Sequence, residues 1–500
     1  MKKNIVSNFS SIAAIAMLVL LFGSCKKDTP VPGGGTVDPP IIVPPVTTMF
    51  DINNIGDTYE SIASFSNYSK WGSHNVHDPS IAKFGEYYYS YSTDVGFGID
   101  VRSGLQVRKS KDLVEWTFVG WVFNSLPTLG ANYIKDAGGT AFNSLWAPYI
   151  LKVGSGYRLY YSLSSAVSRL SVIGLATAPT PDGPWTEKGL AVTSKNDGIV
   201  QTNAIDPTVL VTTGGEHWMY YGSAYDGIYV LQLNPESGLA KSAGDKGVRI
   251  AQRGFTNGIV NGNIEGPEII YNATQNKYYL FIAYDWLESK YNVRVARSDN
   301  PRGPFTDFNG ENINNVKDDG PMIVAPYRFK GHSGYQGTSH CSVFKDDGGQ
   351  FYMGHQARPG SSKYSMNLHV RKMFWMPDGW PVVSPERYAY EENKDVAKDS
   401  ITGAWEQIIL GYNVVPGYAN EQVSPDFQNS TDITIDAAGT INGAAANTWT
   451  YAPPLLTLKW GNGFTDMVYV QKGRDWENKK NTVIFTGLNN MGTAVWGKKK

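Results

Sequence analysis

Apolar and polar residues alternate in short runs along most of the chain, and five of these runs begin with stretches of similar sequence. The stretches are HDPSI (77–81), WAPYI (146–150), IDPTV (205–209), EGPEI (265–269) and SHCSV (339–343). Four of them carry proline as their third residue, which we call the frame position, and Cys341 occupies this position in the fifth. The successive separations are 69, 59, 60 and 74 residues. Recurring units of this size that contain only short strands are typical of propeller blades. The pattern predicts an all-β, five-bladed β-propeller.

Each stretch is followed by further strand-like runs that complete the unit. The second runs are rich in tyrosine, phenylalanine and methionine, and they read YYYSYST, YRLYYSLS, HWMYYGSA, YYLFIAYD and FYMGHQA. A third, alternating run such as NVRVARS (292–298) leads into Asp-Gly, Asn-Pro or Arg-Gly-Pro clusters, which favour hairpins between outer strands. We therefore expect four strands per unit, no long helix, and a propeller that extends over residues 49–395.

The pattern changes in the last fifth of the chain. Runs such as DITIDAAGTINGA (432–444) and TWTYA (448–452) alternate apolar and polar residues between glycine and asparagine turns. This alternation is typical of half-buried antiparallel strands. Residues 398–500 are predicted to form a separate small β-sandwich or barrel, and they contain no obvious cluster of chemically active residues.

The N-terminus has the layout of an export signal. Two lysines precede an apolar run (12–22) that is too short to span a bilayer comfortably, and small residues and Cys25 follow. This ending resembles a bacterial lipoprotein signal, although an ordinary signal peptide with an incidental cysteine would look similar. We expect residues 1–25 to be the signal, with Cys25 as the lipidated residue, and the Pro- and Gly-rich residues 26–48 to be a tether. The protein would then be exported and lipid-anchored to a membrane, with the outer membrane favoured.

The composition of the chain narrows the choice of partners. The formal net charge of −1 gives no support for binding to nucleic acid. Aromatic residues make up 13% of the chain, which suits stacking on sugar rings but is explained equally well by the cores of sheets. Cys341 is the only cysteine besides Cys25, so no intrachain disulfide is expected. We expect a monomer that contacts the membrane only through its lipid anchor.

Acidic residues fall at equivalent places in the repeat. The residues directly before the frame position are Asp78, Ala147, Asp206, Gly266 and His340, with Glu265 one residue further back. A single Asp-Pro pair is usually a turn or strand-entry device. However, equivalent positions in a propeller face one central point, where several carboxylates cost stability unless they are used. An acid for a leaving oxygen and a base for an attacking water are the groups that hydrolysis of a glycosidic bond requires.

Several motifs resemble those of glycoside hydrolase family 43, and most closely those of its endo-α-1,5-L-arabinanases. They occur in the order of the family over about residues 70–390, and they read HDPSI, LWAPYI, NAIDPTV, GSAYDGI, NIEGPEII, YNVRVARSDNPRGPF and VRKMFWMPDGWPVV. The C-terminal region from SITGAWEQI to TAVWGKK resembles the additional β domain of the larger arabinanases. The resemblance implies a five-bladed propeller that hydrolyses with inversion at the anomeric carbon.

The resemblance also implies a role for each acidic residue. Asp78 is expected to be the general base that activates water, and Glu265 the general acid that protonates the leaving oxygen. Asp206 is expected to hold the substrate and, as a fixed negative charge, to keep the acid protonated. In an inverting enzyme the carboxyl groups of acid and base stand roughly 6.5–9.5 Å apart, which leaves room for a water molecule.

Other residues match family positions in the cleft. His340 corresponds to a histidine beside a metal ion, usually calcium, on the propeller axis, and a histidine hydrogen-bonded in the axial cavity is the alternative. Cys341 stands where the family usually has asparagine, which weakens the case for the metal. Trp146 is expected to stack on a sugar, or else to be a core aromatic. Asn203 and Ser223 match sugar-contacting positions, with turn capping as the alternative.

The sequence thus predicts an exported endo-arabinanase that cleaves internal α-1,5-L-arabinofuranosidic linkages of arabinan or arabino-oligosaccharides. An exo-acting β-xylosidase or α-L-arabinofuranosidase of the same family is the nearest alternative. The shape of the loops around the cleft decides between these activities, and the sequence does not show that shape. A non-catalytic surface propeller that binds glycans is a second alternative. Tyr149 replaces an aspartate that is frequent in the family, and a changed contact at the cleft wall is expected there.

Overall fold

The computed structural model describes residues 50–98, 100–199, 201–256, 259–260, 262–315, 320–411 and 424–500. Strands dominate these ranges. The helices found there are α1 (Thr128–Asp136) and the short 3-10 helices η1 (Ile52–Asn54), η2 (Glu60–Ile62), η3 (Phe65–Lys70) and η4 (Lys398–Ser400). Within the described ranges, no helix combines the length and the apolar character that crossing a membrane requires. The predicted all-β class is confirmed, whereas the predicted signal, Cys25 and the whole predicted tether (26–48) lie outside the described residues.

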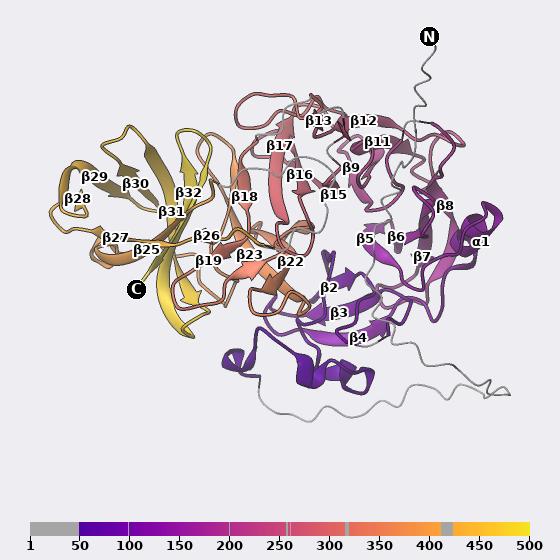
Figure 1. The fold of residues 1–500 in the computed structure, drawn as a ribbon, viewed down its shortest axis with the longest axis horizontal. Helices are drawn as coiled ribbons and strands as arrows, with labels where there is room; N and C mark the ends of the chain where they lie inside the picture. The colour runs from indigo at the N-terminus through magenta and orange to yellow at the C-terminus, as the bar shows by residue number, and fades with distance from the viewer. Residues whose placement is uncertain are drawn as a thin grey trace, which may run out of the picture.

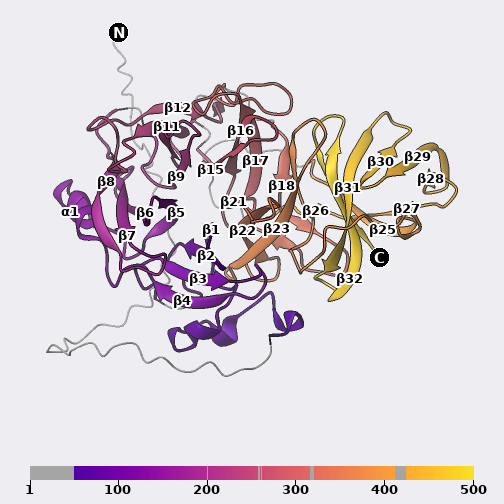
Figure 2. The ribbon, with the colours of Figure 1, turned by 180° about the vertical axis from the view of Figure 1, so that it is seen from behind.

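Four antiparallel sheets of four strands each form propeller blades, and in every one the strands pair in chain order. Figures 1 and 2 show these sheets arranged around a common axis. Their strands are β1 (Ser80–Phe84), β2 (Tyr87–Ser92), β3 (Gln106–Ser110) and β4 (Thr117–Trp121); β5 (Trp146–Val153), β6 (Gly156–Ser164), β7 (Ser171–Ala178) and β8 (Thr186–Ser194); β9 (Thr208–Val211), β10 (His217–Tyr221), β11 (Ile228–Leu233) and β12 (Val248–Ala251); β15 (Ile264–Asn272), β16 (Lys277–Tyr284), β17 (Asn292–Ser298) and β18 (Met322–Val324).

A further set of strands belongs to a seven-stranded sheet. β21 (Cys341–Lys345), β22 (Phe351–Pro359), β23 (Asn367–Trp375) and β24 (Pro381–Val383) pair in chain order. β22 also pairs with β20 (Tyr335–Gln336), and β19 (Tyr327–Arg328) joins β20 to β26 (Gln428–Asn429). The strands β13 (Phe255–Thr256) and β14 (Ile259–Val260) form a separate hairpin.

The C-terminal region is a closed barrel of eight strands, which confirms the barrel of the two predicted alternatives. Its strands are β25 (Gly403–Ile409), β27 (Thr431–Ile435), β28 (Thr440–Ile441), β29 (Ala444–Ala452), β30 (Leu455–Lys459), β31 (Thr465–Asp475), β32 (Lys480–Asn489) and β33 (Ala494–Lys499). Buried side chains such as Trp405, Phe485 and Val468 form a hydrophobic cluster in it. Closure pairs the strand edges that an open sheet would expose.

Apolar side chains between neighbouring sheets hold the blades together. Tyr89 and Tyr91 from β2 form one buried cluster with Leu159 and Tyr161 from β6, so the inner faces of adjacent blades share a core. In each of these two strands the residues of the cluster are two positions apart. They therefore point to the same face of the sheet, because alternate residues of a strand point to opposite faces. The repeated sequence pattern therefore encodes the contacts between blades as well as the strands themselves.

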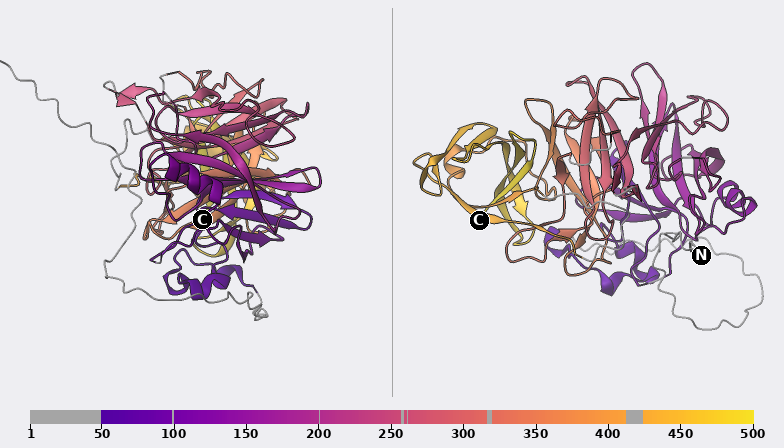
Figure 3. Two further views of the ribbon diagram at one scale, coloured as in Figure 1. Left: turned by 90° about the vertical axis from the view of Figure 1, so that its right-hand side faces the viewer. Right: turned by 45° about the horizontal axis from the view of Figure 1, so that its top comes forward.

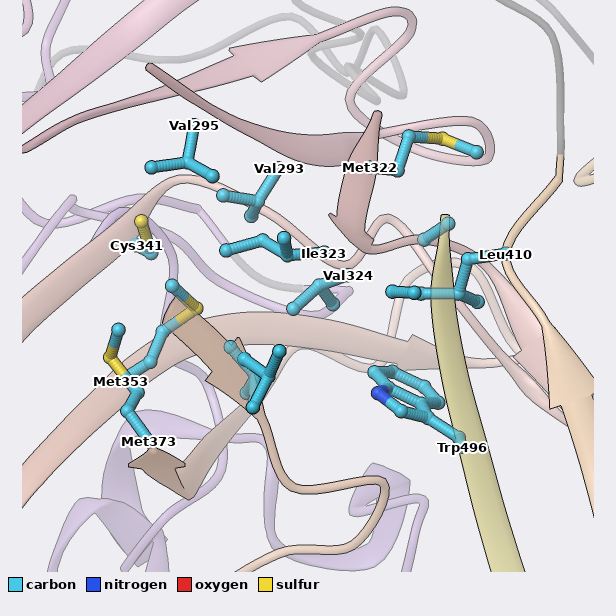
Figure 4. Close-up of a cluster of buried hydrophobic side chains, with 14 of the residues drawn as sticks. Val293, Val295, Met322, Ile323, Val324, Cys341, Met353, Met373, Leu410 and Trp496 are labelled. Atoms are coloured by element: carbon cyan, nitrogen blue, oxygen red, sulfur yellow. The ribbon is translucent and has the colours of Figure 1, made fainter. Parts of the chain in front are cut away.

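The barrel packs against the propeller through a shared hydrophobic cluster. Figure 4 shows Val293 and Val295 from β17 and Met353 from β22 in the same cluster as Leu410 and Trp496 from the barrel. The right-hand view of Figure 3 shows the barrel beside the propeller. Because the two domains bury apolar surface against each other, the barrel is fixed to one side of the propeller.

A buried group of charges lies at the same junction, and we call it the junction cluster. The ammonium group of Lys498 lies 2.9 Å from Glu386, 3.0 Å from Asp475 and 2.5 Å from Glu477. Burial and the neighbouring Glu477 raise the pKa of Glu386 well above its usual range, although Lys498 opposes the shift. Burial opposes the charge on Lys498, but the carboxylates outweigh it and raise the pKa of this lysine.

Candidate active site

The five equivalent positions of the repeat share one unusual backbone conformation. Asp78, Ala147, Asp206, Gly266 and His340 have φ angles of 48°, 34°, 60°, 56° and 51°. Residues other than glycine rarely adopt this left-handed conformation, and such strain concentrates at functional sites. At Gly266 a Cβ atom would lie 2.8 Å from the Nδ1 atom of His340, so a side chain would collide with the histidine ring. The same bend thus recurs at or just before the first strand of each unit.

A cavity of about 740 Å³ brings together most of the residues that the sequence predicts for the site. Asp78, Asp206, Glu265, His340 and Trp146 all line it. Its volume falls within the range of pockets that enclose small-molecule ligands. Further lining residues, which the sequence analysis did not single out for the site, include His77, Thr93, Phe97, Phe142, Trp286, Glu288, Arg358, Tyr364 and Met366.

Asp78 is held by two histidines and a hydroxyl group. Its Oδ1 atom lies 2.9 Å from Nδ1 of His340, its Oδ2 atom lies 2.7 Å from Nδ1 of His77, and Thr93 donates to Oδ2 at 2.6 Å. Burial opposes the charge of this carboxylate, but His77 and His340 outweigh it and hold the pKa of Asp78 well below its usual range. Asp78 is therefore ionised at neutral pH, as a general base must be.

His77 and Gln356 complete this arrangement. The backbone N–H of Asp78 donates to Oε1 of Gln356 at 2.7 Å, and the amide nitrogen of Gln356 lies 2.9 Å from Nε2 of His77. The amide therefore donates to Nε2, so the proton of a neutral His77 ring is on Nδ1, facing Asp78. The sequence could have indicated His77 as a neighbour of Asp78, because His77 precedes it directly. It could not have indicated Gln356, which is 278 positions away in the chain.

Glu265 accepts two hydrogen bonds from hydroxyl groups. Ser223 donates to Oε2 at 2.7 Å, and Tyr291 donates to Oε1 at 2.7 Å. Within the described part of the chain, the residues that line the cavity do not include Ser223 or Asn203. Instead, Asn203 pairs with Ser223 through the backbone, and Ser223 orients Glu265. The sequence analysis did not identify Tyr291, which directly precedes the run NVRVARS.

Asp206 lies close to the charges of Asp78 and Glu265, and a hydroxyl group and a backbone N–H are its hydrogen-bond partners. Its backbone N–H donates to the hydroxyl of Ser162 at 3.0 Å, and its Oδ2 atom accepts from the N–H of Gly266 at 3.2 Å. Burial raises the pKa of Asp206 well above its usual range, and the charges of Glu265 and Asp78 add to the shift, which His340 opposes. The raised pKa favours the protonated form of Asp206 compared with an isolated aspartate, because neighbouring negative charges disfavour one another.

The surroundings of His340 decide how a metal ion could bind. Burial opposes its charge, but Asp78 and the other carboxylates raise the pKa of His340 to about 9. In the described part of the chain, three ligand atoms within 4.8 Å of one another occur only at Glu386, Asp475 and Glu477, outside the axial cavity. A ring nitrogen of His340 could hold a cation only after it loses its proton, and water would have to supply most of the other ligands.

Cys341 and Tyr149 lie away from the cavity wall in the core of the propeller. Cys341 packs in the hydrophobic cluster shown in Figure 4. Tyr149 packs against the cluster between the second and third sheets, where its hydroxyl hydrogen-bonds Thr208. The expected contact of Tyr149 at the cleft wall is therefore wrong, because its side chain fills space between blades.

Aromatic side chains form part of the cavity wall. Trp146 stacks on Phe142 with ring centroids 5.4 Å apart and an interplanar angle of 26°, and its indole N–H donates to Ser144 at 2.7 Å. Trp146 is half-buried and lines the cavity, so part of its ring faces the open volume. Aromatic faces of this kind suit the apolar faces of sugar rings.

A β-propeller that brings three carboxylates to one aromatic-lined cavity has the groups that glycosidic bond hydrolysis requires. The chain belongs to the glycosyl hydrolases family 43, whose sequence model matches residues 72–381. A second model, described as a C-terminal lipocalin-like domain, matches residues 385–497. The protein is therefore a glycoside hydrolase of this family with an additional C-terminal domain.

Two relatives and one solved structure are similar to the chain over most of its length. The extracellular endo-alpha-(1->5)-L-arabinanase of Thermotoga petrophila is 30% identical over 467 residues, which cover 84% of this chain and 93% of the relative. The extracellular endo-alpha-(1->5)-L-arabinanase 2 of Bacillus subtilis is 29% identical over 472 residues, which cover 85% and 93%. The crystal structure of endo-1,5-alpha-L-arabinanase from Thermotoga petrophila RKU-1 superposes with a TM-score of 0.74 at 28% identity, and covers 86% of this chain and 99% of that chain.

Proposed function

We propose that this protein is an endo-arabinanase that cleaves internal α-1,5-L-arabinofuranosidic linkages of arabinan by single displacement. One observation carries the proposal: Asp78, Asp206 and Glu265, which come from three different blades, line one cavity. Two relatives that cover 84% and 85% of this chain are named endo-arabinanases, which supports arabinan as the substrate.

Asp78 is the proposed general base. Its lowered pKa keeps it ionised, and two histidines fix its orientation toward the cavity. In the proposed step Asp78 removes a proton from a water molecule while the water oxygen bonds to the anomeric carbon. The configuration at this carbon inverts because the water attacks from the face opposite the leaving group.

Glu265 is the proposed general acid. As the glycosidic C–O bond breaks, Glu265 transfers a proton to the leaving oxygen, so the products are a hydroxyl group and a hemiacetal. Ser223 and Tyr291 hold both oxygens of Glu265, and their hydroxyl groups can rotate as the carboxyl group gains or loses its proton. Asp206, whose charge interacts with that of Glu265, is the proposed neighbour that favours the protonated acid and holds the substrate.

Product analysis on linear, debranched arabinan tests the endo mode. An endo-acting enzyme releases a ladder of oligosaccharides early and lowers the viscosity of the solution quickly. Release of monosaccharide alone from chain ends would contradict the endo mode and favour the exo-acting alternative. Absence of turnover, together with tight binding of arabinan, would instead favour the non-catalytic glycan-binding propeller.

We also propose that β21–β24 are the fifth blade of the propeller. His340, directly before β21, has the same left-handed conformation as the four equivalent residues of the other units. The backbone N–H of Ile81 in β1 donates to the hydroxyl of Ser342 in β21 at 2.9 Å, which supports neighbouring positions for the first and last units. A crystal structure in which β1 and β21 are not adjacent would contradict this assignment.

We propose that the protein is exported and anchored through Cys25. The relatives named above are described as extracellular, which supports export. A Cys25→Ser variant should lose the incorporation of labelled palmitate and leave the membrane fraction of a Gram-negative host. Membrane association that survives this substitution would rule out Cys25 as the anchor.

We propose that His340 contributes to a hydrated calcium site on the axis. The Nδ1 atom of His340 is held by Asp78, so Nε2 is the ring nitrogen for the ion, and the ring must lose a proton when the ion binds. A bound cation would add positive charge next to the carboxylates and so favour their ionised forms. Metal analysis after dialysis against calcium should find one ion per molecule in the wild type and none in His340→Ala. Equal metal content in both proteins would contradict the assignment.

A further inference from the structure

The segment that precedes the family-matched residues touches the cavity wall. We call residues 50–71 the N-terminal segment; the family 43 model begins only at residue 72. It contains the three short helices η1, η2 and η3, drawn in indigo beside β4 in Figure 1. η3 packs on β4 of the first blade, whereas the side chain of Tyr59 points into the protein and is 2% exposed.

Tyr59 contacts three pieces of the chain that lead to the cavity. Its ring stacks on His74 with centroids 5.1 Å apart and meets Phe97 edge-on at 5.6 Å. Its hydroxyl donates to Asn75 at 3.1 Å and accepts from the backbone N–H of Met366 at 3.4 Å. Tyr59 is therefore the shared neighbour of segments that come from opposite ends of the propeller sequence.

Two of these neighbours form the cavity wall itself. Phe97 and Met366 both line the cavity that holds the three carboxylates. Asn75 extends the connection, because its side-chain amide donates to the backbone oxygen of Val95 at 2.9 Å, and Val95 also lines the cavity. Tyr59 itself is not a lining residue among those described, so it acts on this wall through residues that are.

Contacts with the rest of the protein fix the N-terminal segment in place. Asp57 pairs with His332 at 2.9 Å and accepts from the hydroxyl of Tyr335 at 2.7 Å. Asn53 accepts from Arg474 of β31 at 2.6 Å, so the same segment also reaches the barrel. Because the segment contacts both domains, Tyr59 has a defined position, whereas residues near a chain terminus are often poorly ordered.

We propose that Tyr59 is a positioning residue for substrate binding, which holds Phe97 and Met366 in the geometry that receives the polysaccharide. This inference rests on the proposed arabinanase function. Without the hydroxyl of Tyr59, the backbone N–H of Met366 and the amide oxygen of Asn75 each lose a buried partner. The wall then loosens while the carboxylates, which Tyr59 does not touch, keep their positions.

The test compares Tyr59→Phe with a matched control, Tyr68→Phe. Tyr68 belongs to the same segment but is 41% exposed and packs on Phe118 and Trp121 of the first blade. We expect Tyr59→Phe to raise the KM for linear arabinan about three- to ten-fold, the effect of one or two buried hydrogen bonds, and to leave kcat within about two-fold. Tyr68→Phe should match the wild type in both constants.

Amide hydrogen exchange gives a second readout that does not depend on the substrate. Peptides that cover residues 93–98 and 364–368 should exchange faster in Tyr59→Phe than in Tyr68→Phe, with equal exchange in the barrel. If the wild type does not cleave arabinan while this exchange difference is present, the proposed substrate fails and the positioning role stands. Equal exchange and equal KM in the two variants would overturn the inference, as would a loss confined to kcat.

Discussion

Two clusters in the described part of the chain each combine three carboxylates with one basic side chain. The axial cluster consists of Asp78, Asp206, Glu265 and His340, and it lines the cavity of the propeller. The junction cluster, Glu386, Asp475, Glu477 and Lys498, is buried between propeller and barrel, where its side chains are 2–4% exposed. In both clusters burial and a neighbouring carboxylate raise the pKa of one acidic residue.

The difference between the clusters lies in the arrangement of the basic group. In the junction cluster a single ammonium group contacts all three carboxylates, so their charge is compensated at one point. In the axial cluster His340 pairs with Asp78, while hydroxyl and backbone groups hold Glu265 and Asp206. Separate partners and a cavity leave the axial carboxylates able to take part in proton transfer, whereas one buried lysine compensates the junction carboxylates.

The largest expected effect is on catalysis by the axial cluster. Asp78→Asn and Glu265→Gln should each lower kcat on arabinan by about 10²–10⁴-fold, because each removes a proton-transfer group. Glu265→Gln should leave the melting temperature nearly unchanged, whereas Asp78→Asn should lower it, because two histidines lose the carboxylate that they hold ionised. Asp475→Asn is the matched change in the junction cluster, and it should lower the stability while kcat is retained. A normal kcat in Glu265→Gln would remove this residue as the acid.

The next effect is on stability at the junction cluster. Lys498→Met leaves three buried carboxylates without their cation, and we expect the free energy of unfolding to fall by about 3–5 kcal/mol. Lys330→Met removes a half-exposed ion pair with Asp432 and should leave the free energy of unfolding nearly unchanged. Urea unfolding measures both values. Similar values for the two variants would show that the junction cluster does not stabilise the protein.

A smaller effect depends on pH and concerns Asp57 in the N-terminal segment. Burial opposes its charge, but His332, Arg387 and Tyr335 outweigh it and hold the pKa of Asp57 below its usual range. A lowered pKa in the folded state gives stability that is complete above the unfolded pKa and is lost as the pH falls toward the folded pKa. Asp57→Asn should therefore cost about 2 kcal/mol at neutral pH.

This cost should shrink as the pH falls below about 4, where the unfolded chain begins to protonate its aspartates. Urea unfolding of wild type and variant at several pH values gives the difference directly. Asp347→Asn is the control, because its carboxylate is 83% exposed beside Lys83. A cost for Asp57→Asn that stays constant down to pH 3 would mean that its charge does not contribute.

The repeated sequence frame was sufficient to predict much of the fold and part of the site. Residues at equivalent positions of a propeller face the same axis, so the sequence alone could place Asp78, Asp206 and His340 close together. The turn-punctuated alternation after residue 398 likewise predicted a β domain, although it did not distinguish a barrel from a sandwich. Local periodicity carries this information because it sets which face of each strand is buried.

The remaining features depend on partners that are distant in the chain. Gln356 reaches Asp78 across 278 positions, and Asn53 reaches Arg474 across 421. The helix α1 has an N-terminus that is stabilised by Glu187, whose carboxylate accepts from the N–H of Leu129 at 2.9 Å. None of these contacts leaves a periodic signal, since each depends on how blades and barrel come together.

The stereochemistry of the first product tests the central claim most directly. Proton NMR can follow the anomeric signal of the new reducing end while the enzyme cleaves a linear α-1,5-linked arabino-oligosaccharide. If Asp78 activates water and Glu265 protonates the leaving oxygen, the β anomer forms first and the α anomer appears only through mutarotation. Initial formation of the α anomer would contradict single displacement and the roles assigned to these two carboxylates.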